Sequence, residues 1–248
     1  MVLQAVIFDW GGTLTTRDLG RADLLDLWRL AAHRLDPARE DDLVAALAAV
    51  DERFWQRTTT TFESWRLAEI LEAASIELGL DVTDAVIEEA ATHHLDGWTT
   101  HIRHEADAGR VLRALRARGL RIGLLSNTSW PRAFHEHFLE RDGLVELIDV
   151  RLYTSELGYV KPHPSVFVDA LASVEVGDPR RAVFVGDRPY DDIHGARQAG
   201  LRTVLRASPD VPPYEVEPDA VIDQLSELVD LVDRWNTATT EFQAIGDR

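Results

Sequence analysis

Short apolar runs that end in a polar residue are the feature that most limits how this chain can fold. Residues 2–8, 120–125 and 182–185 are almost continuously apolar and long enough for one strand each. Residues 150–153, which include Arg151, and residues 203–205 form weaker runs, and stretches with helical spacing separate the runs that follow residue 100. Strands that alternate with helices predict an α/β fold with a right-handed, doubly wound parallel sheet.

A helical block interrupts this alternation after the first run. Apolar side chains recur there at helical spacing, as at Leu24 and Leu27, and three or four helices follow one another with no strand between them. We therefore expect a helical cap domain at residues 17–99. It would be inserted into an α/β core domain made of residues 1–16 and 100–248.

The composition is that of a folded and acidic protein. Of the 248 residues, 45% are hydrophobic and 28% are charged, which leaves little room for extended disorder. The 26 basic residues against 43 acidic ones give a net charge of −17, and such a surface repels phosphate backbones and anionic lipid. We therefore expect neither nucleic acid nor a membrane as a partner.

Other counts bear on location and chemistry. No apolar run approaches the ~20 residues that cross a bilayer, and the first residues do not look like a cleavable leader, so we expect a cytoplasmic protein. The sequence does not decide between a monomer and a homodimer. The absence of cysteine excludes disulfides, thiol catalysis and cysteine-ligated zinc. Lys161 is the only lysine, beside 25 arginines, which indicates a position that needs a compact ammonium rather than a planar guanidinium.

Polar residues follow the apolar runs at the places where ligands bind in an open α/β sheet. Asp9 follows the first run directly, Ser126 follows the second, and Lys161 comes after a loop. Asp187 follows the run at 182–185, with Asp192 five residues further on. This set of a nucleophile, a hydroxyl, a cation and two carboxylates suits metal-assisted attack on a phosphate monoester.

Each of these residues also has a simpler interpretation. Asp9 could cap a turn, and Ser126 with Asn127 could cap the helix that follows them. Lys161 could be an ordinary surface lysine, and an acidic loop such as the one holding Asp187 is usually only solvated. The chemical interpretation therefore requires that these side chains meet at one site.

Four motifs, in order along about 190 residues, resemble those of the haloacid dehalogenase superfamily of hydrolases. The sequence DWGGTL at 9–14 looks like the first motif, LLSN at 124–127 the second, Lys161-Pro162 the third, and GDRPYDDIHGA at 186–196 the fourth. The helical insert between the first two motifs is similar to a C1-type cap. The resemblance implies a Rossmann-like core and a phosphatase-type activity.

The resemblance also implies roles for individual residues. It implies that Asp9 is the nucleophile and that Ser126 and Lys161 hold the phosphate. It implies Mg²⁺ as the cofactor, with Asp192 acting through water, and a metal site composed of Asp9, the Gly11 carbonyl, Asp187 and Asp192. The residues that it places along the substrate are Gly12, Thr13, which also braces the loop after the nucleophile, Asn127 and Arg188.

One position departs from the phosphatase pattern. Phosphatases of the family carry a second Asp two residues after the nucleophile, as general acid and base, whereas this chain has Gly11. General acid–base help is worth about 10²–10⁴-fold in rate. We therefore expect slow turnover, a leaving group that needs little protonation, or a cap residue that replaces the acid; Arg57 and His94 are the first to consider.

The favoured function is a Mg²⁺-dependent hydrolase that acts on a small phosphorylated metabolite through an aspartyl-phosphate, and some sugar phosphatases of the family carry Gly at the same position. Family 2-haloacid dehalogenases also lack the second Asp, but they use no metal and would have no need for Asp187 and Asp192. Phosphonoacetaldehyde hydrolases need a cap lysine, and residues 15–100 contain none. A third hypothesis is a phosphate-binding protein with little or no turnover.

Overall fold

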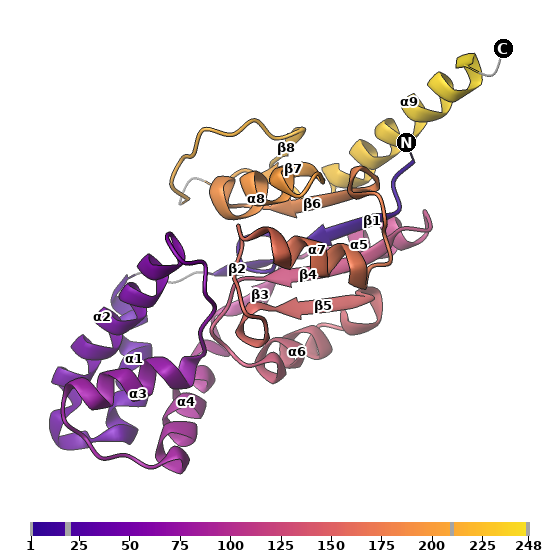
Figure 1. Cartoon of the computed structure of the whole chain (residues 1–248). Helices are drawn as coiled ribbons and strands as arrows, with labels where there is room; N and C mark the ends of the chain where they lie inside the picture. The colour runs from indigo at the N-terminus through magenta and orange to yellow at the C-terminus, as the bar shows by residue number, and fades with distance from the viewer. Residues whose placement is uncertain (1, 18–20, 209–210, 247–248) are drawn as a thin grey trace.

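A six-stranded parallel sheet forms the centre of the computed structural model, which describes residues 2–17, 21–208 and 211–246 (Figure 1). The strand order is β5-β4-β1-β6-β7-β8, and every pairing in this sheet is parallel. This confirms the predicted α/β fold with a doubly wound sheet. The strands are β1 (Ala5–Phe8), β4 (Arg121–Ser126), β5 (Val150–Tyr153), β6 (Ala182–Gly186), β7 (Arg202–Arg206) and the unpredicted β8 (Ala220–Ile222).

Helices cover both faces of the sheet because successive side chains of each strand point to opposite faces. In β1, Val6 and Phe8 join the core cluster that contains side chains of α5, α6 and α9, whereas Ala5 and Ile7 join the cluster under α7 and α8. None of the described helices is both long and apolar enough to cross a membrane. The five helices are α5 (Ala108–Arg116), α6 (Arg132–Arg141), α7 (Pro164–Ser173), α8 (Gly195–Gln198) and α9 (Glu227–Gly246).

Short helical turns lie in several of the connections. Four are 3₁₀ turns, and the fifth is a π-helical turn that carries the end of the fourth motif. They are η1 (Pro37–Arg39), η2 (Val145–Leu147), η3 (Thr154–Glu156), η4 (Pro179–Arg181) and the π turn η5 (Pro189–His194).

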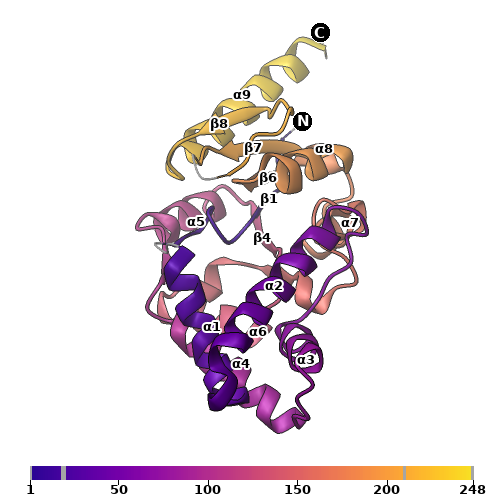
Figure 2. The ribbon, with the colours of Figure 1, turned by 90° about the vertical axis from the view of Figure 1, so that its left-hand side faces the viewer.

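Four helices follow one another after β1 and before α5, within the predicted three or four, and lie together on one side of the sheet (Figures 1 and 2). Their apolar side chains form a core cluster of their own. An unpredicted antiparallel pair of three-residue strands, β2 (Thr15–Arg17) and β3 (Ile102–His104), joins this block to the sheet. The helices are α1 (Arg21–Leu35), α2 (Glu40–Thr58), α3 (Leu67–Glu77) and α4 (Asp84–Trp98); the division into domains at residues 17 and 99 stays a prediction.

The helical block is also attached to the sheet at a second place, the segment between α2 and α3. The backbone N–H of Val160 donates to the Phe62 carbonyl at 2.8 Å, and that of Leu67 donates to the Ser129 carbonyl at 2.8 Å. Val160 belongs to the core cluster of the four helices although it directly precedes Lys161 in the sequence. Helix α2 is therefore held next to the segment that carries Lys161.

Candidate functional site

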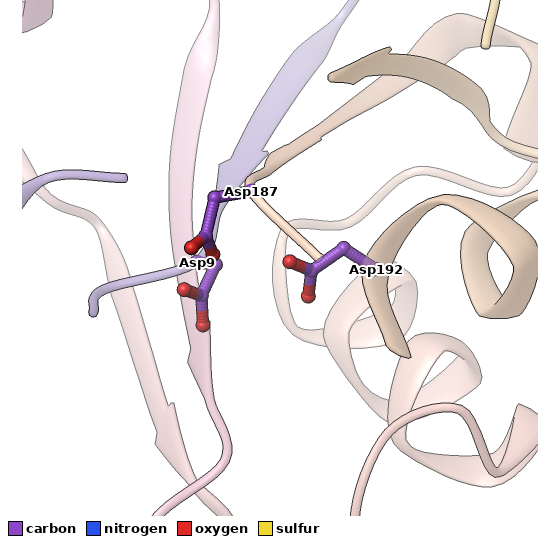
Figure 3. Close-up of side chains that lie close together, drawn as sticks. All are labelled: Asp9, Asp187 and Asp192. Atoms are coloured by element: carbon purple, nitrogen blue, oxygen red, sulfur yellow. The ribbon is translucent and has the colours of Figure 1, made fainter. Parts of the chain in front are cut away.

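Three carboxylates from the strand ends meet at one buried point. Asp9 follows β1 and Asp187 follows β6, and because these strands are neighbours in register, with Phe8 opposite Val185, the two residues emerge side by side. Asp192 reaches the same point from η5, as Figure 3 shows. The three side chains are buried and each offers a carboxylate oxygen within 4.8 Å of the other two. These three carboxylates therefore meet at one site, as the chemical interpretation requires.

Lys161 lies between two of these carboxylates. Its Nζ donates to Asp9 Oδ1 and to Asp192 Oδ1, both at 2.7 Å, and the side chain is only 2% exposed. Burial alone would lower the pKa of Lys161, but the charges of Asp192 and Asp9 and their hydrogen bonds raise it above its ordinary value. The ammonium is therefore charged, and the interpretation of Lys161 as a surface lysine is wrong.

Ser126 and Asn127 lie at the end of β4, beside the same point. Ser126 is 3% exposed, and the following helix α6 begins without a hydrogen bond from a capping side chain, so the capping interpretation of this pair is wrong. The amide of Asn127 accepts from the Lys161 N–H at 2.8 Å and donates to the Lys161 carbonyl at 3.0 Å. Asn127 thus holds the backbone of Lys161 in place, while its contact with substrate stays a prediction.

The loop after Asp9 packs directly on Asp187. Gly12 has φ of +84°, and a Cβ at this position would lie 2.2 Å from Asp187 Oδ2, so only glycine fits there. Thr13 is fully buried in the same loop, but its hydroxyl has no hydrogen-bond partner among the described residues, so its role as a brace stays a prediction. Gly11 lines the cavity described below and offers no side chain, so nothing in this loop can act as an acid.

Arg206, at the end of β7, holds this loop from the other side and was missed by the sequence analysis. Its Nη1 donates to the carbonyls of Gly12 at 3.1 Å and Thr13 at 2.7 Å, and its Nη2 pairs with Glu105 close to β3. The predicted strand at 203–205 ended one residue too early. The rule that functional side chains follow strand ends would have found Arg206 had the strand been given its true length.

A cavity of about 830 Å³ opens above these residues, between the sheet and the helical block. On the sheet side it is lined by Asp9, Ser126, Asn127, Lys161 and Arg188. On the other side it is lined by side chains of α1, α2 and α4, among them three tryptophans. Of the predicted catalytic and substrate-binding residues, these five therefore line one partly open cavity, whereas Gly12 and Thr13 do not line it.

Neither cap residue considered first as a replacement acid suits that role. The ring of His94 accepts from Trp98 Nε1 at 3.1 Å through Nε2, and its Nδ1 lies 3.1 Å from the Leu27 carbonyl. Burial lowers the pKa of His94 to about 4, so this histidine is neutral and structural. Arg57 stacks on the ring of Phe54 and does not line the cavity.

The family model described as haloacid dehalogenase-like hydrolase matches residues 3–200, and the chain belongs to this family of hydrolases. The chain is 30% identical over 156 residues to a glyceraldehyde 3-phosphate phosphatase of Pyrococcus furiosus, a match that covers 59% of this chain and 62% of that protein. It is 28% identical over 242 residues to an N-acetylmuramic acid 6-phosphate phosphatase of Pseudomonas aeruginosa, covering 94% and 96%.

Solved structures of the same family share the fold across nearly the whole chain. A 2-haloacid dehalogenase from Pseudomonas syringae pv. Tomato superposes with a TM-score of 0.69 and 26% identity, covering 94% of this chain and all of that one. A HAD phosphatase from Thermococcus onnurineus superposes with a TM-score of 0.62 at 23% identity, covering 93% and 98%. The predicted family and the predicted class of enzyme, a hydrolase, are confirmed.

Proposed function

We propose that this protein hydrolyses phosphate monoesters of small metabolites, with Asp9 as the nucleophile and Mg²⁺ as the cofactor. The observation that carries the proposal is the meeting of Asp9, Asp187 and Asp192 within 4.8 Å of one another, with Lys161 hydrogen-bonded to two of them. Phosphatases among the relatives, including the full-length match from Pseudomonas aeruginosa, support the same reaction class.

The acidic cluster fits a divalent cation by its charge and by its donor atoms. Three buried carboxylates face one buried ammonium, so the cluster carries an excess of negative charge when all groups are ionised. Burial, with the repulsion of Asp9 and Asp187, raises the pKa of Asp192 despite Lys161. Carboxylates and a backbone carbonyl are the hard oxygen ligands that Mg²⁺ prefers. Asp9, the Gly11 carbonyl, Asp187 and Asp192 would hold it, and the bound ion would neutralise charge on the phosphate.

Asp9 reacts in two steps. One carboxylate oxygen attacks phosphorus, the P–O bond to the alcohol breaks, and the departing oxygen takes a proton from solvent because Gly11 offers none. Water then attacks phosphorus, releases inorganic phosphate and frees the Asp9 carboxylate. Lys161 keeps a positive charge next to Asp9 in both steps, and Ser126 donates to a phosphoryl oxygen.

The direct test is phosphate release from glyceraldehyde 3-phosphate, from sugar phosphates and from 4-nitrophenyl phosphate, with Mg²⁺ or with EDTA. We expect Mg²⁺-dependent release, fastest for the aryl ester because its leaving group needs little protonation. Mg²⁺ should also raise the melting temperature of the wild type, and this rise should be absent in Asp187→Asn. Release that persists in EDTA, or a Mg²⁺ effect that survives in Asp187→Asn, would contradict the metal site.

Dehalogenation of a short 2-haloacid is the second candidate, since the solved dehalogenase from Pseudomonas syringae matches this chain over its full length. Halide release from 2-chloropropionate that is indifferent to EDTA would favour this reaction. We expect no halide above background, because Asp187 and Asp192 add negative charge that an anionic haloacid would face at close range. Tight binding of phosphate without turnover of any substrate would instead favour a phosphate-binding protein.

Replacing Arg206 tests whether the loop after Asp9 must be held in place. We expect Arg206→Met to lower kcat by about 10–100-fold, with a smaller change in KM, because the carbonyls of Gly12 and Thr13 lose their donor. Arg206→Lys should recover part of the rate, and Arg103→Met, an exposed site on β3, serves as the control. An unchanged kcat in Arg206→Met would show that the loop after Asp9 keeps its conformation without Arg206.

A further inference from the structure

The cap side of the cavity differs in chemistry from the sheet side. Five residues of α2 and the residue after it line the cavity, at spacings that place them on one face of the helix: Asp51, Glu52, Trp55, Gln56, Thr58 and Thr59. This α2 face carries two carboxylates. The remaining cap wall is largely aromatic, with Trp28 and Trp98 next to the neutral ring of His94.

Positive charge is confined to the sheet side of the cavity. The basic side chains that line it are Lys161, which is paired with Asp9, and Arg188, which lies 3.5 Å from Asp191. Among the cap side chains that the structure describes, no Lys or Arg lines the cavity. A second anionic group on a substrate would therefore meet carboxylates and no cation at the cap end.

Four arginines of the cap make their contacts away from the cavity. Arg29 pairs with Glu40 and Asp41, and Arg34 and Arg53 pair with carboxylates of α4 and α3. Arg57 stacks on a phenylalanine ring of its own helix, as described above. These contacts direct the positive charge of the cap away from the cavity.

Asp51 is the residue of the α2 face that lacks a partner. Glu52 accepts a hydrogen bond from Gln56 at 2.9 Å, whereas Asp51 is partly buried and has no hydrogen bond or ion pair with any described residue. Burial first, and then the charge of Glu52, raises the pKa of Asp51 to about 6. At neutral pH this carboxylate is ionised without a counter-charge, which is unfavourable unless a bound cation supplies one.

We propose that the cavity selects phosphate monoesters whose alcohol part carries a positive charge, with the phosphate at Asp9 and Lys161 and the cationic end against Asp51 and Trp55. This inference rests on the proposed phosphatase function and names its substrate class, the phosphate esters of amino alcohols and quaternary ammonium alcohols. A carboxylate beside an indole ring recognises an ammonium group by charge and by cation–π attraction. The same wall repels esters that carry a second anion, such as phosphoglycolate.

The test compares esters of similar length that differ in charge at the far end: 2-aminoethyl phosphate and phosphocholine, 2-hydroxyethyl phosphate, and 2-phosphoglycolate. For the wild type we expect kcat/KM to be about 10-fold higher for the cationic esters than for the neutral one, which is roughly 1.4 kcal/mol, and lowest for phosphoglycolate. Equal or higher values for the neutral or anionic ester would overturn the inference while leaving the phosphatase function intact. If no ester, including 4-nitrophenyl phosphate, is hydrolysed, the proposed function itself fails, and the inference with it.

Asp51→Asn removes the charge and keeps the shape of the side chain. We expect its kcat/KM for 2-aminoethyl phosphate to fall about 10-fold and its value for 2-hydroxyethyl phosphate to change less than 3-fold. The quantity compared between variants is the ratio of kcat/KM for 2-aminoethyl phosphate to kcat/KM for 2-hydroxyethyl phosphate. The different reactivity of the two leaving groups cancels in this comparison. Asp42→Asn, an exposed position on the same helix outside the cavity, should leave the ratio unchanged. An unchanged ratio in Asp51→Asn would overturn the role of Asp51.

The melting temperature gives a second readout that does not depend on activity. A carboxyl whose pKa is raised on folding stabilises below its unfolded pKa and loses that stabilisation as the pH rises through about 6. Asp51→Asn should therefore melt about 2–6 °C higher than the wild type at pH 8, and no higher at pH 4. The other charged and titratable groups that line the cavity are Glu52 on the same helix, His94 on α4, and Asp9, His135, Lys161, Arg188, Tyr190 and Asp191 from the rest of the chain. A lower melting temperature at pH 8 would show that Asp51 has a stabilising partner.

Discussion

We expect Asp9→Asn to abolish phosphate release from every ester, with a loss in kcat of about 10⁴–10⁶-fold, because the amide cannot attack phosphorus. The substitution is nearly isosteric. Its Oδ1 can still accept the hydrogen bond that Lys161 now donates to Asp9 at 2.7 Å. Lys161 also keeps its second partner, Asp192. The loss should therefore come from the missing nucleophile and not from a disturbed site.

The measurement is a single-turnover and steady-state assay of phosphate release, with 4-nitrophenyl phosphate as the most reactive ester. Asp169→Asn, an exposed position on α7, is the matched control and should keep full activity. The melting temperature of Asp9→Asn should stay within a few degrees of the wild type. Full activity in Asp9→Asn would exclude the covalent mechanism and leave attack by water as the alternative.

Strand ends explain why much of the site could be predicted from the sequence. In a parallel sheet the carboxyl ends of the strands meet at one edge, so Asp9 and Asp187 had to lie close together once each followed a buried strand. Ser126 follows from the same rule. The strand-end rule alone does not identify Lys161, because a loop of several residues separates it from the nearest strand. Lys161 could be predicted because it is the only lysine in the sequence.

The cap wall could not be predicted in the same way. Helical spacing identifies the apolar side of α2, where Leu43, Leu47 and Val50 pack into the cap core, but it does not fix where the opposite side faces. Asp51 borders the apolar side, and its place in the cavity depends on how segment 62–67 attaches to the sheet. That attachment consists mainly of backbone hydrogen bonds, which cannot be predicted from the pattern of side chains.

Short elements were missed for a related reason. β2, β3 and β8 have three residues each, too few to show the alternation of apolar and polar side chains that identifies a strand. Their positions are set by partners distant in sequence, as when Thr15 pairs with His104 across the whole helical block. The sequence could therefore predict the order of the main elements but not the ribbon that joins the cap to the core.

Lys161→Met is expected to combine a loss of activity with a large loss of stability, because among the described side chains Lys161 is the one cation that contacts Asp9 and Asp192. Both carboxylates are buried, so each would be left as an uncompensated charge or would have to bind a proton. Removing one partner from a buried ion pair costs about 3–5 kcal/mol, which lowers the melting temperature of a chain this long by about 6–20 °C. Phosphate release should fall by at least about 10²-fold, since the charge next to the nucleophile is gone.

Lys161→Arg separates the charge of this residue from its shape. The guanidinium keeps the positive charge, so most of the stability should return, but its planar fork does not match two carboxylates that now share one ammonium at 2.7 Å each. Lys161 is also packed over the ring of Phe184, with 5.2 Å between Nζ and the ring centroid, which leaves little room for a larger group. We therefore expect Lys161→Arg to fold and to remain nearly inactive, as measured by thermal unfolding and phosphate release on the same samples. A variant as active as the wild type would mean that any cation suffices, and that the single lysine of this chain has no chemical reason to differ from its 25 arginines.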